Sequence, residues 1–86
     1  MEKSTFTREY HCLKTLLRKY RLEAGLTQVQ LAKKIGETQS FVSKCERGER
    51  RLDLVQLRAF CRAIGIELKV FIGAFESVLS QGRQSS

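Results

Sequence analysis

The chain has 86 residues, of which 42% are apolar and 29% are charged, a composition typical of one soluble globular domain. The longest apolar run, residues 70–75, is interrupted by a glycine and is far shorter than the roughly 20 residues that cross a bilayer. The net charge is +7, so acidic ligands are favoured and, because the first seven residues are polar and no apolar signal sequence follows, we expect a cytoplasmic protein.

The first predicted helix covers about residues 7–24. Leu13, Leu16, Leu17 and Tyr20 recur at spacings of three, four and seven, which is one face of an α-helix. Lysine and arginine fill the other face. Gly25 follows, and because glycine tolerates a positive φ, it is expected to end this helix.

The second predicted helix begins after Thr27 with a capping box. The Thr27 hydroxyl can accept a hydrogen bond from the amide of Gln30, and the Gln30 side chain can accept one from the amide of Thr27. Leu31 and Ile35 form the inward face. Gly36 is predicted to stop the helix after only about two turns.

The third predicted helix covers residues 39–47 and starts only three residues after the second one stops. Thr38 is its expected N-cap, and Val42 and Cys45 are on its buried side. Gly48 is expected to end it. A polar and charged loop, with the sequence ERGERR, follows.

The sequence defines the fourth predicted helix more clearly than the fifth. Asp53 and Gln56 form a second capping box, which starts a fourth helix that ends at Gly65. After it, alternating apolar residues over 66–72 allow a strand, but a longer helical series continues past Gly73, so a helix over about 67–80 is favoured. That helical series consists of Leu68, Phe71, Ile72, Phe75, Val78 and Leu79.

These elements predict an all-α fold, a compact bundle of about five short helices in one domain over residues 1–80, with residues 81–86 as a frayed polar tail. The three cysteines, Cys12, Cys45 and Cys61, have no metal-ligand spacing and are interpreted as buried apolar side chains. No catalytic motif, phosphate loop or metal-ligand set is present. We therefore expect no enzyme activity, cofactor or metal.

The short break between the second and third helices has a steric explanation. Two helices that cross at about 90–120° after a short turn come very close together, so a small residue is needed at the crossing. Ala32 supplies it, Gly36 supplies the positive φ of the turn, and Val42 is a rigid β-branched wedge between the helices.

This pattern resembles the helix-turn-helix of the Cro and lambda-repressor-like family, also called the xenobiotic response element family. The resemblance covers about residues 10–72, with the motif at 28–47 between the lead-in LRKYRLEAGLTQVQLA and the exit SKCERGER. Glu37 departs from the family, which often has an apolar residue there. The resemblance implies a transcriptional regulator, most simply a repressor, that binds the major groove of double-stranded DNA.

Candidate DNA-contacting residues follow from the outer face of the third helix and from this resemblance. A glutamine can pair with an adenine edge and a lysine can donate to guanine, while serine can contact bases or phosphates. The expected base-reading residues are Gln39, Ser40, Ser43 and Lys44, and the expected phosphate contacts are Thr27, Gln28, Thr38, Arg47, Arg50 and Arg51. The resemblance also implies a structural ion pair between Arg21 and Glu46. A solvated helix face and solvated loop charges are the alternatives that the residues alone leave open.

The expected assembly is a homodimer on a palindromic operator, because one short reading helix touches only a few base pairs. The final helix is more apolar than a terminal helix needs, so Phe75, Val78 and Leu79 are a candidate subunit interface. Packing of this whole face within one chain is the alternative. No domain for a small-molecule effector is evident. An antitoxin that also holds a toxin, or a controller of restriction–modification genes, is the competing functional class.

Overall fold

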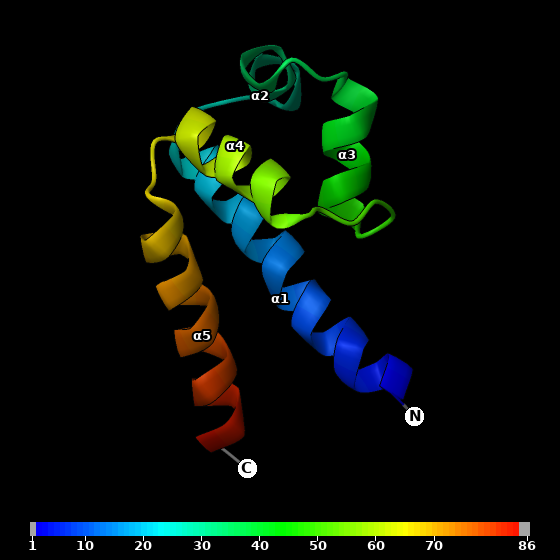
Figure 1. The fold of residues 1–86 in the computed structure, drawn as a ribbon, viewed down its shortest axis with the longest axis vertical. Helices are drawn as coiled ribbons and strands as arrows, with labels where there is room; N and C mark the ends of the chain where they lie inside the picture. The colour runs from blue at the N-terminus through cyan, green and yellow to red at the C-terminus, as the bar shows by residue number, and fades with distance from the viewer. Residues whose placement is uncertain (1, 85–86) are drawn as a thin grey trace.

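The computed structural model describes the backbone of residues 2–84 and the side chains of residues 8–81. Within that range the chain folds into five α-helices and no strand, which confirms the predicted all-α fold (Figure 1). The helices are α1 (Glu2–Glu23), α2 (Gln28–Ile35), α3 (Gln39–Arg47), α4 (Leu54–Ile64) and α5 (Leu68–Gln84).

The ends of the two short central helices follow the predicted local chemistry. Thr27 Oγ1 accepts from the Gln30 amide at 3.1 Å, and Gln30 Oε1 accepts from the Thr27 amide at 2.9 Å, so the capping box of α2 is complete. Thr38 Oγ1 accepts from the Phe41 amide at 3.1 Å and caps α3 in the same way. Gly36, with a φ of 71°, closes α2 in the left-handed conformation and redirects the chain into α3.

The outer helices are longer than predicted. α1 begins at Glu2, five residues before residue 7, and α5 continues to Gln84, beyond the predicted end at residue 80. No proline interrupts either extension, and Gly82 alone lowers helix stability by only about 1 kcal/mol. Residues 85 and 86 of the expected polar tail lie outside the described residues.

The strand alternative for residues 66–72 is wrong, because the segment is helical from Leu68 onward. A strand over 66–72 would place Phe71 on the face opposite Val70 and Ile72 and would bury the latter two, which are 50% and 39% exposed. The helix instead places Phe71 and Leu79 on one face about two turns apart. Both are buried in the described structure. The burial of this face agrees with the helical period of the segment and not with the strand period.

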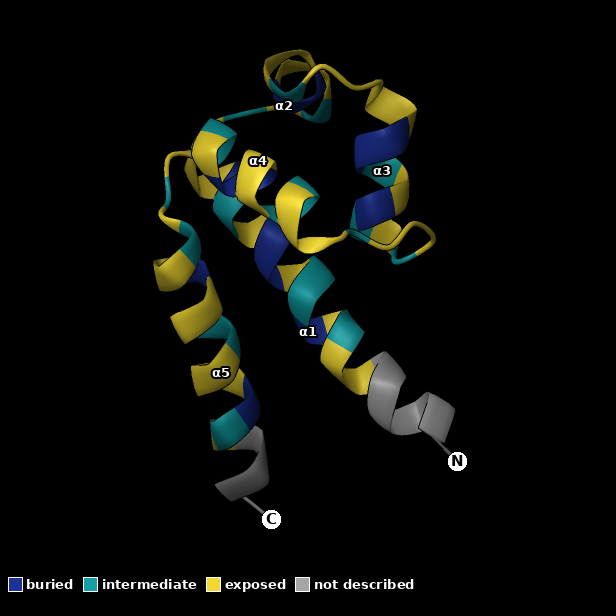
Figure 2. Ribbon diagram, viewed as in Figure 1, coloured by how far each residue is buried: buried dark blue, intermediate teal, exposed yellow. Residues whose placement is uncertain are grey.

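The core lies where α1 meets the other helices. α1 contacts α3, α4 and α5, while α2 packs against α3 and α4. Figure 2 shows the buried segments of α1 and α3 turned towards the inside of the bundle. The side chains that are almost completely buried are Leu17, Leu31, Val42, Cys45, Phe60, Cys61 and Phe71.

All three cysteines are buried and unbridged, as predicted. Burial in the apolar core raises the pKa of the Cys45 and Cys61 thiols to about 11, so both are protonated at neutral pH. Among the described residues, no three His, Cys, Asp or Glu side chains gather as metal ligands would. None of the helices in the described range combines the length and the apolar character that spanning a bilayer requires.

Candidate nucleic-acid interface

The outer face of α3 carries the side chains that the sequence predicts to read DNA bases. Gln39, Ser40 and Lys44 are exposed, and Ser43 is half-buried. The opposite face, with Phe41, Val42 and Cys45, is buried in the core. The helix therefore presents a polar ridge to solvent while its apolar face holds it on the domain.

Behind this ridge lies a buried ion pair between α1 and α3. Arg21 donates from Nε to Glu46 Oε2 at 2.6 Å and from Nη2 to Glu46 Oε1 at 3.0 Å, a two-pronged contact. Arg21 Nη1 also donates to the carbonyl oxygen of Leu26 at 2.8 Å. The two side chains are only 7% and 4% exposed. The pair implied by the family resemblance is present and ties α1 to the back of α3.

Two glutamines continue this ion pair to the surface, an arrangement that the sequence pattern does not predict. Gln28 Nε2 donates to Glu46 Oε1 at 3.0 Å, and Gln28 Oε1 accepts from Gln39 Nε2 at 2.7 Å. Arg21, Glu46, Gln28 and Gln39 thus form one hydrogen-bonded series, which we call the glutamine relay. Gln28 and Gln39 each occupy the first position of a short helix, and only the angle between α2 and α3 brings them together.

The relay determines which end of each glutamine amide faces outward. An ionised carboxylate can only accept hydrogen bonds, so Gln28 turns its NH₂ group towards Glu46 and its carbonyl oxygen towards Gln39. Gln39 donates one N–H of its own NH₂ group to that carbonyl oxygen. Its second N–H and its carbonyl oxygen remain, and together they match the N7 acceptor and N6 donor of an adenine edge.

Of the predicted phosphate contacts, Arg47 is held by neighbours. Its guanidinium donates to both carboxylate oxygens of Glu49, at 3.0 Å and 3.1 Å, and also to Ser43 Oγ. The hydrogen bond and charge of Arg47 lower the pKa of Glu49. A phosphate that bound Arg47 would have to displace this carboxylate, and base contact by Ser43 would require Arg47 to move.

Arg50 and Arg51 lie in the loop between α3 and α4, and each covers an aromatic ring. The Arg50 guanidinium carbon is 4.9 Å from the Phe41 ring centre, and that of Arg51 is 4.8 Å from the Tyr10 ring centre. Cation–π stacking leaves the in-plane N–H groups of a guanidinium pointing sideways, where a phosphate can accept from them. Both arginines are exposed.

Two residues of α1 support this loop, and the sequence pattern predicts neither contact. Tyr10 Oη donates to the carbonyl oxygen of Arg50 at 3.1 Å and accepts from the Leu52 amide at 3.2 Å. Lys14 Nζ donates to the carbonyl oxygen of Arg47 at 3.2 Å, at the C-terminal end of α3. Partial burial raises the pKa of Tyr10. The residues joined by these hydrogen bonds are 33 to 42 positions apart in the sequence, so no local pattern predicts the contacts.

The candidate subunit interface on α5 is only partly available. Leu79 was expected there, but it is 8% exposed and belongs to the core of the single chain, so it is not free to meet a second copy. Phe75 is half-buried and packs against the core. Val78 is 45% exposed. Leu79 turns inward because it lies on the same face of α5 as the buried Phe71.

Known proteins with a similar sequence or structure agree with this geometry. The family described as helix-turn-helix matches residues 17–71. An uncharacterised HTH-type transcriptional regulator from Methanothermobacter thermautotrophicus is 36% identical over 55 residues, which are 64% of this chain and 80% of that protein.

Solved structures extend the likeness to most of the chain. An XRE-family like protein from Pseudomonas syringae pv. tomato is 40% identical with a TM-score of 0.83, over 90% of this chain and 94% of that one. The restriction–modification controller protein C.Esp1396I is 26% identical with a TM-score of 0.75, over 80% of this chain and 91% of its own. The same controller is also known as a tetramer in complex with its natural 35 base-pair operator. With a helix-turn-helix at its centre and these relatives, the chain belongs to the XRE-type helix-turn-helix family of DNA-binding transcriptional regulators.

Proposed function

We propose that this protein binds a specific double-stranded DNA operator with α3 in the major groove and represses transcription by occupying a promoter. The observation that carries the proposal is the glutamine relay, which holds the Gln39 amide in one orientation at the exposed start of α3. An α-helix about 10–12 Å across fits a major groove about 12 Å wide.

Each predicted contact has a chemical role in this complex. Gln39 pairs with an adenine edge, Lys44 donates to guanine, and Ser40 and Ser43 contact bases or nearby phosphates. The phosphates are held by the amide-rich starts of α2 and α3, with Thr27, Gln28 and Thr38, and by the loop arginines Arg47, Arg50 and Arg51. The exposure of most of these side chains supports this assignment.

Gln39→Ala should weaken binding to the best operator by about 1–3 kcal/mol and relax the preference at one base step, since the lost contact is to a base edge. Arg51→Ala should weaken binding to all sequences alike, because a phosphate contact carries no base information. Fluorescence anisotropy on a set of duplexes with single-base changes measures both effects. A Gln39→Ala variant that lost affinity equally for every duplex would contradict the base-reading assignment.

We further propose that two copies bind a palindromic operator, because specificity from such a short reading helix needs two half-sites about 34 Å apart. The exposed Val78 and the half-buried Phe75 on α5 support a seam along this helix. A dimer would also bring the cations of two chains to one stretch of duplex.

Val78→Asp should convert the dimer to monomers at micromolar concentration, because it places a charge in an apolar contact. Size-exclusion chromatography with light scattering measures the molecular mass directly. Val55→Asp is the matched control, since Val55 is the same residue type on α4 and is even more exposed. Dissociation by Val55→Asp but not by Val78→Asp would move the seam to α4, and a monomeric wild-type chain that binds palindromic DNA cooperatively would rule out a preformed dimer.

A second candidate function is control of restriction–modification genes. The likeness to C.Esp1396I over 91% of that controller favours it. In that case the operator should lie upstream of a methyltransferase or endonuclease gene and of the regulator itself. Selection of bound duplexes from a random pool, followed by a search of the source genome for the selected site, distinguishes this role from regulation of other genes.

A further inference from the structure

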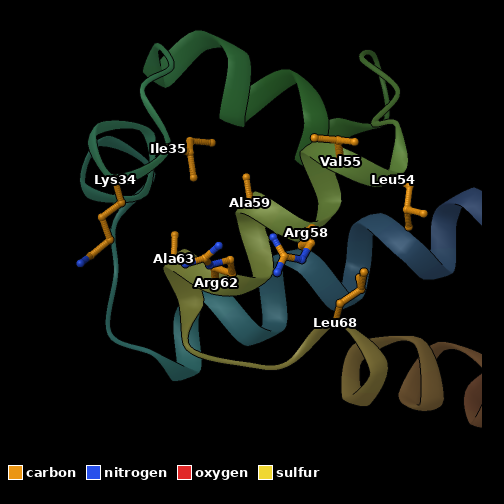
Figure 3. Close-up of a pocket in the computed structure, with 9 residues that line it drawn as sticks. All are labelled: Lys34, Ile35, Leu54, Val55, Arg58, Ala59, Arg62, Ala63 and Leu68. Carbon is orange, nitrogen blue, oxygen red and sulfur yellow. The ribbon is translucent and has the colours of Figure 1, made fainter.

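A groove on the outer face of α4 lies outside the DNA-contacting residues. It has a volume of about 810 Å³, and Figure 3 shows its lining side chains coming from the end of α2, along α4 and from the start of α5. We call it the α4 groove. Its lining consists of Lys34, Ile35, Leu54, Val55, Arg58, Ala59, Arg62, Ala63 and Leu68. None of these belongs to the set proposed to contact DNA.

The floor of the α4 groove is apolar and unusually exposed. Leu54 and Val55 are 63% and 78% exposed, the two highest values among the large apolar side chains of the described residues. Ala59 is exposed and Ala63 is half-buried on the same helix. Their small side chains leave room for another helix to pack closely against α4. Apolar area of this kind marks a contact surface for another protein rather than for solvent.

The charges around the groove are all positive. Lys34, Arg58 and Arg62 are exposed, and the lining contains no acidic residue. Within the described part of the chain, none of these three cations forms an ion pair. Arg58 and Arg62 are four residues apart, so they lie on one side of α4, one turn from each other. Figure 3 labels both side chains on α4 beside the groove.

We propose that the α4 groove docks an acidic amphipathic helix of a partner protein. Apolar side chains of that helix would cover Leu54 and Val55, and carboxylates one turn apart would meet Arg58 and Arg62. Because the groove shares no residue with the DNA-contacting set, the partner could bind while the regulator occupies its operator. Docking in the α4 groove does not depend on the DNA contacts proposed above.

Two other occupants fit the groove less well. DNA phosphates would satisfy the cations but gain nothing from an apolar floor of six side chains. A second copy of this chain that docked through the same groove would bring the same three cations and no carboxylate to it. If two α4 helices packed antiparallel over the groove centre, Arg58 would lie next to the Arg58 of the other copy, and like charges so placed repel each other.

The first test uses two labelled helical peptides and the full chain. Both peptides carry leucines at helical spacing on one face, and the flanking positions are glutamate in one peptide and glutamine in the other. The glutamate peptide should bind at least about tenfold more tightly at low salt. Its binding should shift the backbone amide NMR signals of Val55, Ala59 and Ala63 and leave that of Lys44 in place.

The second test reverses the charges. Arg58→Glu with Arg62→Glu should weaken binding of the glutamate peptide at least about tenfold, and a peptide with lysine at the flanking positions should bind this double variant instead. Lys33→Glu with Lys69→Glu is the matched control, because it makes the same change in net charge at exposed positions outside the groove. The control should keep its affinity for the glutamate peptide within about twofold.

Four results would overturn the proposal. Equal loss of peptide binding in both double variants would show only non-specific attraction to a basic protein. Shifts at Ala59 and Ala63 that grow with protein concentration and no peptide would assign the groove to a second copy. Loss of operator binding by the Arg58 and Arg62 variant well beyond that of the control would assign the two arginines to DNA. The glutamine peptide binding as tightly as the glutamate peptide would remove the acidic specificity.

Discussion

Replacing Glu46 with alanine should lower the free energy of unfolding by about 3–5 kcal/mol, because it leaves Arg21 charged and unpaired in the interior. A domain of this size is stable by only about 5–15 kcal/mol, so the melting temperature should fall by at least about 10 °C. Urea unfolding and thermal melting followed by circular dichroism measure the change. Loss of DNA binding in this variant should follow mainly from loss of the fold.

Two further variants separate the structural role of the pair from its role in the glutamine relay. Glu49→Ala removes an exposed carboxylate that also pairs with an arginine, and it should leave the melting temperature unchanged. Arg21→Met with Glu46→Leu replaces both buried charges by apolar groups and should recover most of the lost stability. That double variant should still discriminate poorly between operators, because Gln28 has lost the acceptor that orients it. An unchanged melting temperature in Glu46→Ala would show that the ion pair does not stabilise the fold.

The affinity for the operator should fall about 10⁴-fold when the salt concentration rises from 50 to 200 mM. This value assumes that each subunit neutralises about four phosphates, which gives a slope of log affinity against log salt near −7 for a dimer. Anisotropy titrations at constant pH provide the slope. Arg51→Ala should make the slope less steep by about one for each subunit, because one released counterion per subunit is lost.

The slope also tests the assembly and the ligand. A value near half of that for the dimer would indicate that a single subunit is the binding unit. Gln39→Ala is the control variant, because it removes a base contact without removing a charge, and its slope should match that of the wild-type chain. A slope near zero would exclude nucleic acid as the ligand.

Local patterns were sufficient to predict the central helices. Thr27, Thr38 and Asp53 are caps and Gly36 is a turn residue for reasons that involve only a few neighbouring residues, and the structure places each in that role. The helical period also predicted α5, although the ends of α1 and α5 were set too short. Residues 2–6 and 81–84 contain only one apolar residue, Phe6, so the helical spacing of apolar residues does not define these boundaries.

The sequence by itself therefore determined the order of the helices, their caps, the buried faces of α1, α2 and α3 and the polar ridge on α3, because these depend on spacing and on short-range hydrogen bonds. Only the tertiary structure decided that Gln28 reaches both Glu46 and Gln39, that Tyr10 holds the loop after α3, and that Leu79 is used by the core. Each of these contacts depends on the angles at which the helices pack and on which side chains fill the shared core. No pattern along the chain encodes that geometry until the helices are packed together.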